Sequence, residues 1–394
     1  MVNSNKIENY KKNEKLDIFA ICIFFIIIFI QTLLFTSFDH FFSSAAFFLG
    51  KLETWLILFF VGYALFVKIT YRKLIFALII LSIAMYSQVI SGTSTPFIKL
   101  LMLIVAVPRT IPSVRAIIKT FGIAMSTTLI LTIFLSIVGY LPISGETSRV
   151  LFSNYQETVY FFGFTHPNIF GTFLTTIFMI LYFLYFKRTP KLVISVAIIF
   201  LIIDKVIAAG TASVGIAMIL VLTFIHSVGK KQIWLGRFGK LGYFLPLILT
   251  AFSFWLADNN TSQLGMFINE KIASRPNIWH AYLTQYPIKV FNTIPDIQLD
   301  GINTILGNGA LDGGYIYVLI NFGIIAWIVY TIIFDCLIKI GIQSNNFQLY
   351  SIALVIILMS FPESHMIMFF ENVFLILFGF YQYPKSQRIQ LLRQ

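Results

Sequence analysis

The 394-residue chain has a formal net charge of +12, from 28 Lys and Arg against 16 Asp and Glu, yet only 11% of its residues are charged and 58% are hydrophobic. Soluble domains contain about 25% charged residues, so this composition excludes a soluble fold and indicates an integral membrane protein. The apolar runs approach the ~20 residues that a helix needs to cross a bilayer, and they do not alternate as barrel strands would. We therefore expect an all-α polytopic membrane protein with a single domain over residues 1–394. The basic excess fits cytoplasmic loops better than a nucleic-acid partner.

The apolar runs predict about twelve transmembrane helices, with a range of ten to twelve. The range is open because the fourth run is short and contains Lys99, and because Pro362 separates the last two. The expected spans are 18–37, 53–69, 74–90, 96–108, 116–139, 167–186, 191–208, 212–228, 241–257, 313–335, 348–361 and 367–383.

The distribution of charge predicts which ends of these spans face the cytoplasm. With the N-terminus inside, 21 of the 28 cations fall in or beside the inner segments, and only four of the sixteen acidic residues do. Positive charge accumulates on the cytoplasmic side of membrane proteins. Both termini are therefore predicted to be cytoplasmic.

Two long connections are then expected on the outer side, at 140–166 and 258–312. Loops of this length without evident structure of their own are usually functional. The second is the longest polar passage of the chain. We interpret both as functional extracytoplasmic loops.

Several chemistries have no motif in this chain. It contains no GxxxxGK[ST] phosphate loop, no HExxH zinc helix and no DxD pair for a metal-bound nucleotide sugar. Cys22 and Cys336 lie in or beside expected spans, where they are interpreted as packing residues. No metal and no cofactor are expected.

The first candidate stretch is GFTHPNIFG, 163–171, at the outer entry to an expected span. His166 and Asn168 lie at the start of this helix, where exposed N–H groups favour an anionic ligand. Alternatively, Pro167 only begins the helix and Asn168 satisfies the local backbone. Both interpretations remain open.

The second candidate stretch surrounds Arg275. If the stretch is helical, Lys271 and Arg275 share one face, with Trp279 and His280 following. A guanidinium at the membrane boundary can bind two phosphate oxygens at once. The alternative is a snorkelling cation beside an interfacial tryptophan.

The third candidate stretch is GNGALDGGY, 307–315, in which glycines allow tight turns around Asn308, Asp312 and Tyr315. A carboxylate at the mouth of the next span could act as a general base or anchor a sugar hydroxyl. Asp312 could equally be an ordinary helix N-cap.

The fourth candidate stretch is SFPESHMIMFFEN, 360–372, which contains Glu363, His365 and Glu371. Ionisable residues inside apolar spans are costly and typically face a cavity or a partner. Asp204 and Lys205 are similarly situated. As neighbours on a helix they point in different directions, so each is expected to have its own partner.

These four stretches, in this order, resemble those of the bacterial Wzy-type polymerases of O-antigen and capsular polysaccharide, which are related to the O-antigen ligases. The resemblance covers about Leu141 to the C-terminus, whereas the first four spans match only as generic apolar helices. The matching segments are GFTHPN at 163–168, SRPNIW at 274–279, GNGALDGGYIYVLINFGII at 307–325 and PESHMIMFFEN at 362–372.

The resemblance implies a metal-independent glycosyltransferase of the bacterial cytoplasmic membrane. It would join oligosaccharide repeat units carried on undecaprenyl diphosphate at the outer leaflet, passing the growing chain to a hydroxyl of an incoming unit. Arg275 matches the family's arginine before the Trp and would hold the diphosphate, while Asp312 and His166 would orient or deprotonate the acceptor hydroxyl. The lipid-linked oligosaccharide, the bilayer, a chain-length regulator and a flippase are the implied partners.

The chain departs from the family pattern at two places. Tyr160 and Phe161 stand where an arginine is common, and Arg149 upstream is the candidate substitute. Residues 211–214 stand where many members have Ser-Arg, which leaves Lys205 as the nearby cation.

A ligase, a transporter and a cell-wall polymerase of the shape-and-division type are the competing interpretations. When Tyr315 is aligned, Asp312 occupies the position where ligases have a histidine, which favours a polymerase. Carriers are often built from two similar halves, and residues 1–190 and 191–394 show no such similarity. The polar candidates also gather at the outer face rather than at the midplane.

The charge distribution makes a direct prediction of topology. Tags at both termini should report a cytoplasmic location, and a reporter within 258–312 should report the outside. A cytoplasmic signal from that loop would contradict the topology and the function inferred from it.

Overall fold

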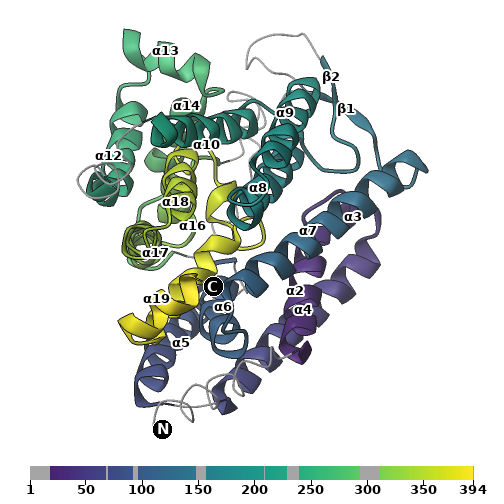
Figure 1. Cartoon of the computed structure of the whole chain (residues 1–394). Coiled ribbons are helices and arrows are strands. Elements are labelled where there is room, and N and C mark those ends of the chain that lie inside the picture. The colour runs from purple at the N-terminus through teal and green to yellow at the C-terminus, as the bar shows by residue number, and fades with distance from the viewer. Residues whose placement is uncertain are drawn as a thin grey trace, which may run out of the picture.

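The computed structural model describes residues 18–67, 70–91, 96–147, 157–207, 209–228, 239–292 and 311–393, and these are almost entirely helical (Figure 1). The elements in chain order are α2 (Ile18–Leu34), α3 (Phe38–Phe41), α4 (Ser43–Phe66), α5 (Tyr71–Ser91), α6 (Pro96–Thr110), α7 (Val114–Ile137), β1 (Ser144–Thr147), β2 (Glu157–Tyr160), α8 (Pro167–Tyr185), α9 (Pro190–Ile207), α10 (Gly210–Val228), η2 (Gly239–Phe244), α12 (Leu245–Asp258), α13 (Gln263–Lys271), α14 (Arg275–Gln285), α16 (Gly314–Asn321), α17 (Ile324–Gln343), α18 (Phe347–Met359), η3 (His365–Ile367), η4 (Val373–Gln382) and α19 (Lys385–Arg393).

Many of these helices have the length and composition of membrane spans. Seven of the described segments are long and apolar enough to cross a bilayer, and α2, α18 and η4 are shorter apolar helices. The expected class, an all-α protein embedded in the membrane with several passes, is therefore confirmed. The total of twelve spans, and the side of the membrane on which each terminus lies, stay predictions.

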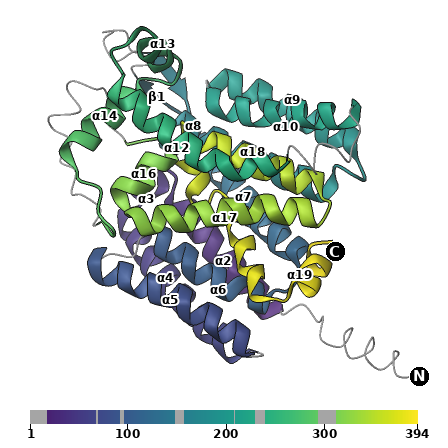
Figure 2. The ribbon, with the colours of Figure 1, turned by 90° about the vertical axis from the view of Figure 1, so that its left-hand side faces the viewer.

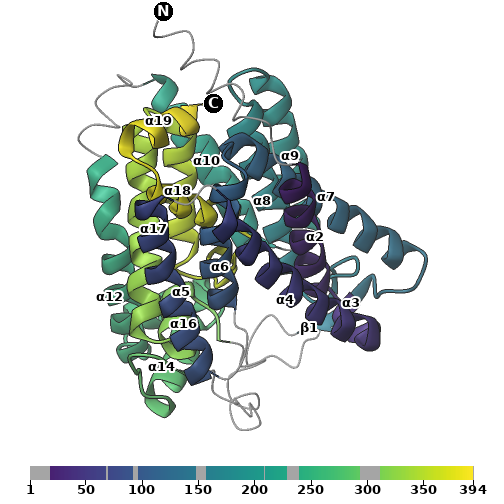
Figure 3. The ribbon, with the colours of Figure 1, turned by 90° about the horizontal axis from the view of Figure 1, so that it is seen from below.

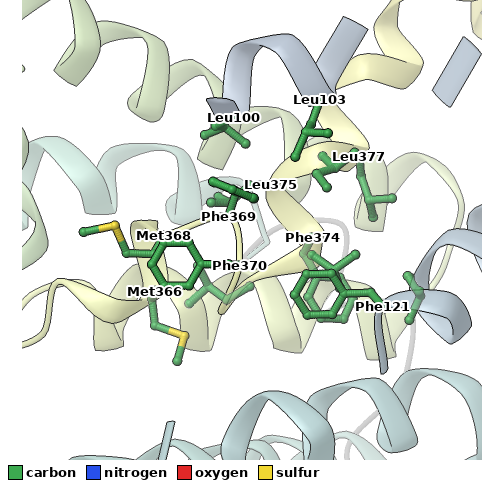
Figure 4. Packing of buried hydrophobic residues seen from close by; sticks show 14 of the residues in the cluster. Leu100, Leu103, Phe121, Met366, Met368, Phe369, Phe370, Phe374, Leu375 and Leu377 are labelled. Carbon is green, nitrogen blue, oxygen red and sulfur yellow. The ribbon is translucent and has the colours of Figure 1, made fainter. Parts of the chain in front are cut away.

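The helices α4 and α5 lie along one side of the bundle and α9 and α10 along the opposite side, with α17 and α18 between them (Figure 2). Contacts between elements distant in sequence hold the layers together, notably α2 with α7 and α6 with η4. Close packing around η4 is visible in Figure 4, where Leu100 and Leu103 of α6 and Phe121 of α7 surround Phe374 and Leu377.

Helix α4 begins at Ser43, ten residues before the expected start of the span at 53. The added segment contains Lys51, and Glu53 follows it within the same helix. Glu53 is fully buried, and its Oε2 accepts a 2.6 Å bond from Nζ of Lys99 on α6. The Glu53 charge is thus neutralised inside the bundle.

The expected span 313–335 is not one helix, which corrects the sequence prediction. It consists of α16 and α17, separated at Phe322 and Gly323. Segment 289–292 crosses this break: Ile324 and Ile325 donate to the carbonyls of Lys289 and Val290, and the Asn292 side chain donates to the carbonyls of Leu319 and Ile320. The helix can be interrupted in an apolar interior because these bonds satisfy the backbone groups that the break frees.

The last expected span, 367–383, also differs from the prediction. Residues 360–372 are mostly turn and extended chain around the short η3, and the helix that follows, η4, is of the 3₁₀ type from Val373. The buried Asn372 side chain begins η4 by accepting from the Phe374 N–H while donating to the Met366 carbonyl. A non-helical polar segment thus lies between apolar helices.

The two long loops have secondary structure that the sequence did not predict. The loop 258–312 contains α13 and α14, and residues 293–310 lie outside the described part. The loop 140–166 contains the antiparallel pair of β1 and β2, in which Ser144 pairs with Tyr160. These elements lie at the end of the bundle opposite α19, as Figure 3 shows for α14 and β1.

Basic side chains at the α19 end of the bundle bind backbone carbonyls of neighbouring helices. Arg109 donates to the carbonyls of Ala64, near the end of α4, and Lys73, in the first turn of α5, and Arg115 donates to that of Leu184 near the end of α8. At the ends of α4 and α8 cations are favourable because the carbonyl end of a helix carries partial negative charge. Three of the segments predicted to face the cytoplasm therefore meet at this end.

The break between α16 and α17 gives a prediction of stability. Gly323 has φ of +90°, and a Cβ at this position would lie 2.7 Å from the Val290 carbonyl oxygen. We expect Gly323→Ala to destabilise the protein by about 1–3 kcal/mol, lowering its thermal midpoint in detergent.

Gly62→Ala is the matched control, because a Cβ at Gly62 on α4 meets nothing within 4 Å. Removing a helical glycine should leave stability unchanged or raise it by up to about 1 kcal/mol. Equal midpoints for the two variants would contradict this account of the break.

Candidate functional site

Five ionisable side chains form a connected group at the end of the bundle that contains α14. We call this group the Arg275 cluster. Arg275 begins α14, Asp312 precedes α16, and the other members follow α18 in the segment 360–372. The members are Arg275, Asp312, Glu363, His365 and Glu371.

The Arg275 guanidinium joins two carboxylates from separate parts of the chain. Its Nη2 lies 2.8 Å from Asp312 Oδ2 and 2.6 Å from Glu363 Oε1, while Nη1 donates to the Ile272 carbonyl at 3.0 Å. Arg275 is 7% exposed. Burial by itself would lower the pKa of Arg275, but Asp312 and Glu363 outweigh it and raise the pKa. This guanidinium is thus a buried, paired cation and not a snorkelling one.

Asp312 uses both of its carboxylate oxygens in bonds with the protein. Oδ2 receives Arg275, and Oδ1 accepts from the N–H of Gly313 at 3.0 Å and from the N–H and hydroxyl of Ser364 at 2.7 and 3.0 Å. Burial opposes ionisation, yet Arg275 and His365 lower the pKa of Asp312 below its usual value. Asp312 is therefore an ionised carboxylate that connects α14 with the segment after α18. It is more than the simple N-cap considered from sequence.

Trp279 is part of the packing that holds Asp312 in place. The indole is fully buried and donates from Nε1 to the Asp312 carbonyl at 2.6 Å. A Cβ at Gly313, where φ is +89°, would lie 2.6 Å from the indole ring. The motif residues Trp279 and Gly313 are thus explained by close packing, and the interpretation of Trp279 as an interfacial aromatic is wrong.

Glu363 has one oxygen bound on two sides and one oxygen without a partner. Oε1 accepts from Arg275 and from the hydroxyl of Thr211 at 2.6 Å, whereas Oε2 has no hydrogen-bond partner among the described residues. Burial, together with the charge of Asp312, raises the pKa of Glu363 to about 7 against the lowering effect of Arg275. Glu363 is therefore the carboxylate of the cluster that can change its charge near neutral pH.

His365 pairs with the last member of the cluster. Its Nδ1 lies 3.1 Å from Glu371 Oε2, and its Nε2 lies 3.9 Å from Glu363 Oε2. Burial lowers the pKa of His365, but Glu371, Glu363 and Asp312 together raise it to about 10. His365 is thus positively charged at neutral pH. The apolar residues between the two ends of this segment, including Met366, pack into the core (Figure 4).

His166 forms the N-cap of α8, with its Nδ1 accepting from the Asn168 N–H at 3.1 Å. Burial, followed by the charge of His365, lowers the pKa of His166 despite an opposing effect of Asp312. The neutral ring then carries its proton on Nε2, because Nδ1 is an acceptor. The expectation that residues 166–168 begin a helix is confirmed, and His166 lies near the Arg275 cluster.

The remaining predicted residues lie in other environments. Lys271, His280 and Lys205 are exposed, and Asn168 is half-buried. Tyr315 is buried, and its hydroxyl donates to the Ile357 carbonyl at 2.8 Å. Arg149 and Asn308 lie outside the described residues.

Lys271 and Arg275 do not share a helical face, contrary to the sequence prediction. Helix α13 ends at Lys271 and α14 begins at Arg275, with a turn between them in which Ala273 and Ser274 have φ of +52° and +61°. Lys271 is exposed beside Glu270, whereas Arg275 points into the cluster. The two cations therefore cannot act as one clamp in this conformation.

Sequence reasoning missed two hydroxyl residues that hold the cluster. Ser364 was inside a motif already selected, so its role could have been suspected. Thr211 had no such signal, because it was noted only as a departure from a family pattern. A second buried group was also missed: Lys99 donates to Glu53 and, at 3.0 Å, to Gln31 of α2. Its members come from three helices, and no local pattern connects them.

No family model, curated protein or solved structure matches the chain. The resemblance to the Wzy-type polymerases therefore depends on the four motifs. All four contribute to one region, through His166, Arg275, Asp312 and Glu363. Within the described residues, no three His, Cys, Asp or Glu side chains are arranged to hold a metal ion.

The cluster makes a prediction of stability. Arg275→Ala would leave Asp312 and Glu363 buried beside each other without their cation, at a cost of about 3–5 kcal/mol. We expect a clearly lower thermal midpoint in detergent.

Lys271→Ala is the control, since Lys271 is exposed and its contact with Glu270 spans 3.4 Å. Exposed ion pairs contribute about 0–1 kcal/mol, so its midpoint should match that of the wild type. A wild-type midpoint for Arg275→Ala would show that the ion pairs do not support the fold.

Proposed function

We propose that the protein is a polymerase that joins lipid-diphosphate-linked oligosaccharide repeat units into a surface polysaccharide at the outer leaflet of the bacterial cytoplasmic membrane. The observation that carries this proposal is the convergence of the four motifs. They are separated by up to about two hundred residues, yet each contributes a side chain to the region of the Arg275 cluster.

The composition of the cluster suits a sugar hydroxyl better than a diphosphate. The positive charges of Arg275 and His365 are each paired with carboxylates of the cluster, Asp312 and Glu363 for Arg275 and Glu371 for His365. Carboxylates and imidazoles bind hydroxyl groups and transfer their protons. We therefore assign this region to the acceptor sugar.

The lipid diphosphate then requires cations near the cluster. Arg275 supplies positive charge, but its Nη2 is shared between two carboxylates and its Nη1 is bound to a carbonyl. The exposed Lys271 and Lys205 are the other candidates in the described part, and Arg149 is a further one. Fixed cations would stabilise the charge that develops on the leaving diphosphate.

Transport of repeat units across the membrane is the second candidate function. Gln31 of α2, Glu53 of α4 and Lys99 of α6 form a polar group between these three helices. The group is remote in sequence from the four motifs. Ionisable groups within membrane helices often line transport pathways. The pair is fully formed in this structure, however, and it also serves to join three helices.

Reconstitution of the purified protein in proteoliposomes tests the proposal. The substrate is the lipid-linked repeat unit extracted from cells in which the gene has been deleted. We expect a ladder of lengthened lipid-linked glycans, formed without nucleotide.

Other products would identify the competing functions. Movement of single units between leaflets without lengthening would indicate a flippase. Transfer of preformed polymer to a different lipid, with no ladder from single units, would indicate a ligase. Either result would overturn the proposed polymerase.

A further inference from the structure

We infer that Glu363 is the general base of the transfer reaction, accepting the proton of the acceptor hydroxyl through its unpartnered oxygen Oε2. This inference rests on the proposed function. It assigns the proton transfer to a residue other than the two that the sequence suggested, Asp312 and His166.

Asp312 is unsuited to the role because its lone pairs are already in use. Its two oxygens together accept four hydrogen bonds, one of them from Arg275. A proton would have to displace one of these donors, and the lowered pKa of Asp312 reflects that cost. Asp312 is instead a positioning residue, which holds Arg275 and Ser364.

The two histidines are also poor proton acceptors at neutral pH. Nδ1 of His166 accepts from the Asn168 N–H, so the neutral ring presents an Nε2–H donor. His365 is already protonated because Glu371 and Glu363 raise its pKa to about 10. Both rings can donate hydrogen bonds to substrate oxygens, but neither offers a free lone pair.

Glu371 is the remaining carboxylate, and it lies behind His365. It is fully buried, its Oε2 is bound to Nδ1 of His365, and its Oε1 has no hydrogen-bond partner among the described residues. Its side chain joins the cluster only through His365, whereas Glu363 contacts Arg275 directly. Glu371 therefore acts through His365 by fixing the orientation of the ring.

Glu363 combines a fixed carboxylate with a buried oxygen that has no hydrogen-bond partner among the described residues. Arg275 and Thr211 hold Oε1 at 2.6 Å each, so the direction of Oε2 is set from two sides. Nε2 of His365 lies 3.9 Å from Oε2, which is too far for a hydrogen bond. The Glu363 side chain is 3% exposed, and the neighbouring side chains of Asp312 and His365 are 23% and 13% exposed.

The proton and electron balance of the step is simple. The acceptor O–H gives its proton to Glu363 Oε2 while the acceptor oxygen forms a bond to the anomeric carbon of the donor sugar. The bond from that carbon to the diphosphate oxygen breaks, and the diphosphate leaves with the electron pair. A diphosphate is stable as an anion and needs no proton, so one base suffices, and Glu363 then releases its proton to water.

The charged neighbours of Glu363 determine how its protonation depends on pH. Burial and Asp312 favour the protonated form, whereas Arg275 and His365 favour the carboxylate. The pKa of about 7 means that the basic form becomes populated as the pH rises through neutrality. Thr211, the contributor from α10, is uncharged and adds no further titration.

The test compares initial polymerisation rates of the wild type and Glu363→Gln in the reconstituted system from pH 5.5 to 8.5. We expect the wild-type rate to rise about tenfold per pH unit below pH 7 and then level off. Glu363→Gln keeps the acceptor for Arg275 and Thr211 but loses the base, so its kcat should fall by about 10²–10⁴-fold. KM for the lipid-linked unit should change little, and the pH dependence should disappear.

Asp335→Asn is the matched control, because Asp335 on α17 also has a buried oxygen without a hydrogen-bond partner among the described residues. Its rate and pH profile should match the wild type. Glu363→Asp, which retains a carboxylate, should retain a pH-dependent rate.

The outcomes separate this inference from the function on which it rests. A wild type that forms no polymer overturns the proposed function. A Glu363→Gln variant that polymerises with the wild-type pH profile overturns only the role of Glu363. A folded Glu363→Gln variant with wild-type kcat and raised KM would assign Glu363 to binding and would also overturn the role as base.

Discussion

The sharing of one guanidinium between two carboxylates is the interaction on which the candidate site depends. Arg275 contacts Asp312 and Glu363 through a single nitrogen, and these residues precede α16 and follow α18. An isolated charge is expensive to bury, but a pair with satisfied hydrogen bonds persists. The ion pairs therefore fix where three separate parts of the chain meet. They also set the unequal protonation of the two carboxylates.

The second constraint is that irregular backbone inside the apolar bundle needs hydrogen-bond partners for its polar groups. The break between α16 and α17 and the segment 360–372 both expose N–H and C=O groups that a continuous helix would have bonded internally. Segment 289–292 satisfies the first, and Asp312 satisfies part of the second through Ser364. Irregular backbone at such depth is tolerated where the protein itself supplies the partners. The segment 360–372 also contributes three of the five members of the Arg275 cluster.

The unequal roles of the carboxylates have a direct chemical consequence. Two adjacent acids can have different pKa values because their environments differ. One then remains charged while the other exchanges a proton. Here Asp312 receives four hydrogen bonds and stays ionised, while Glu363 retains an unpartnered oxygen. Arg275 binds both carboxylates, so its positive charge stabilises the ionised form of each. Mutation of Arg275 is thus expected to disturb structure and proton transfer together.

Local sequence patterns were sufficient for the class of protein and for most helix positions, because continuous apolar runs can only be buried in lipid or in the bundle. They also identified the three stretches that form the cluster and the stretch of His166 beside it, since polar residues are conspicuous in such runs. They failed for the start of α4, for the division of 313–335 and for the faces of Lys271 and Arg275. In the first two cases the deciding partner is distant: Lys99 neutralises Glu53 within α4, and residues 289–292 bridge the broken helix. In the third, a local turn at Ala273 and Ser274 separates α13 from α14.

Only the tertiary structure decided which groups bind Glu363. Arg275 reaches Glu363 across 88 residues, and Thr211 reaches it across 152. Sequence spacing cannot specify such contacts, because they follow from how the helices pack. By itself the sequence determined a multi-pass α-helical membrane protein and the segments that contain its ionisable groups. The fold determined which of those groups are paired, which are charged and which oxygen remains without a donor, because burial and hydrogen bonding depend on neighbours that are remote along the chain.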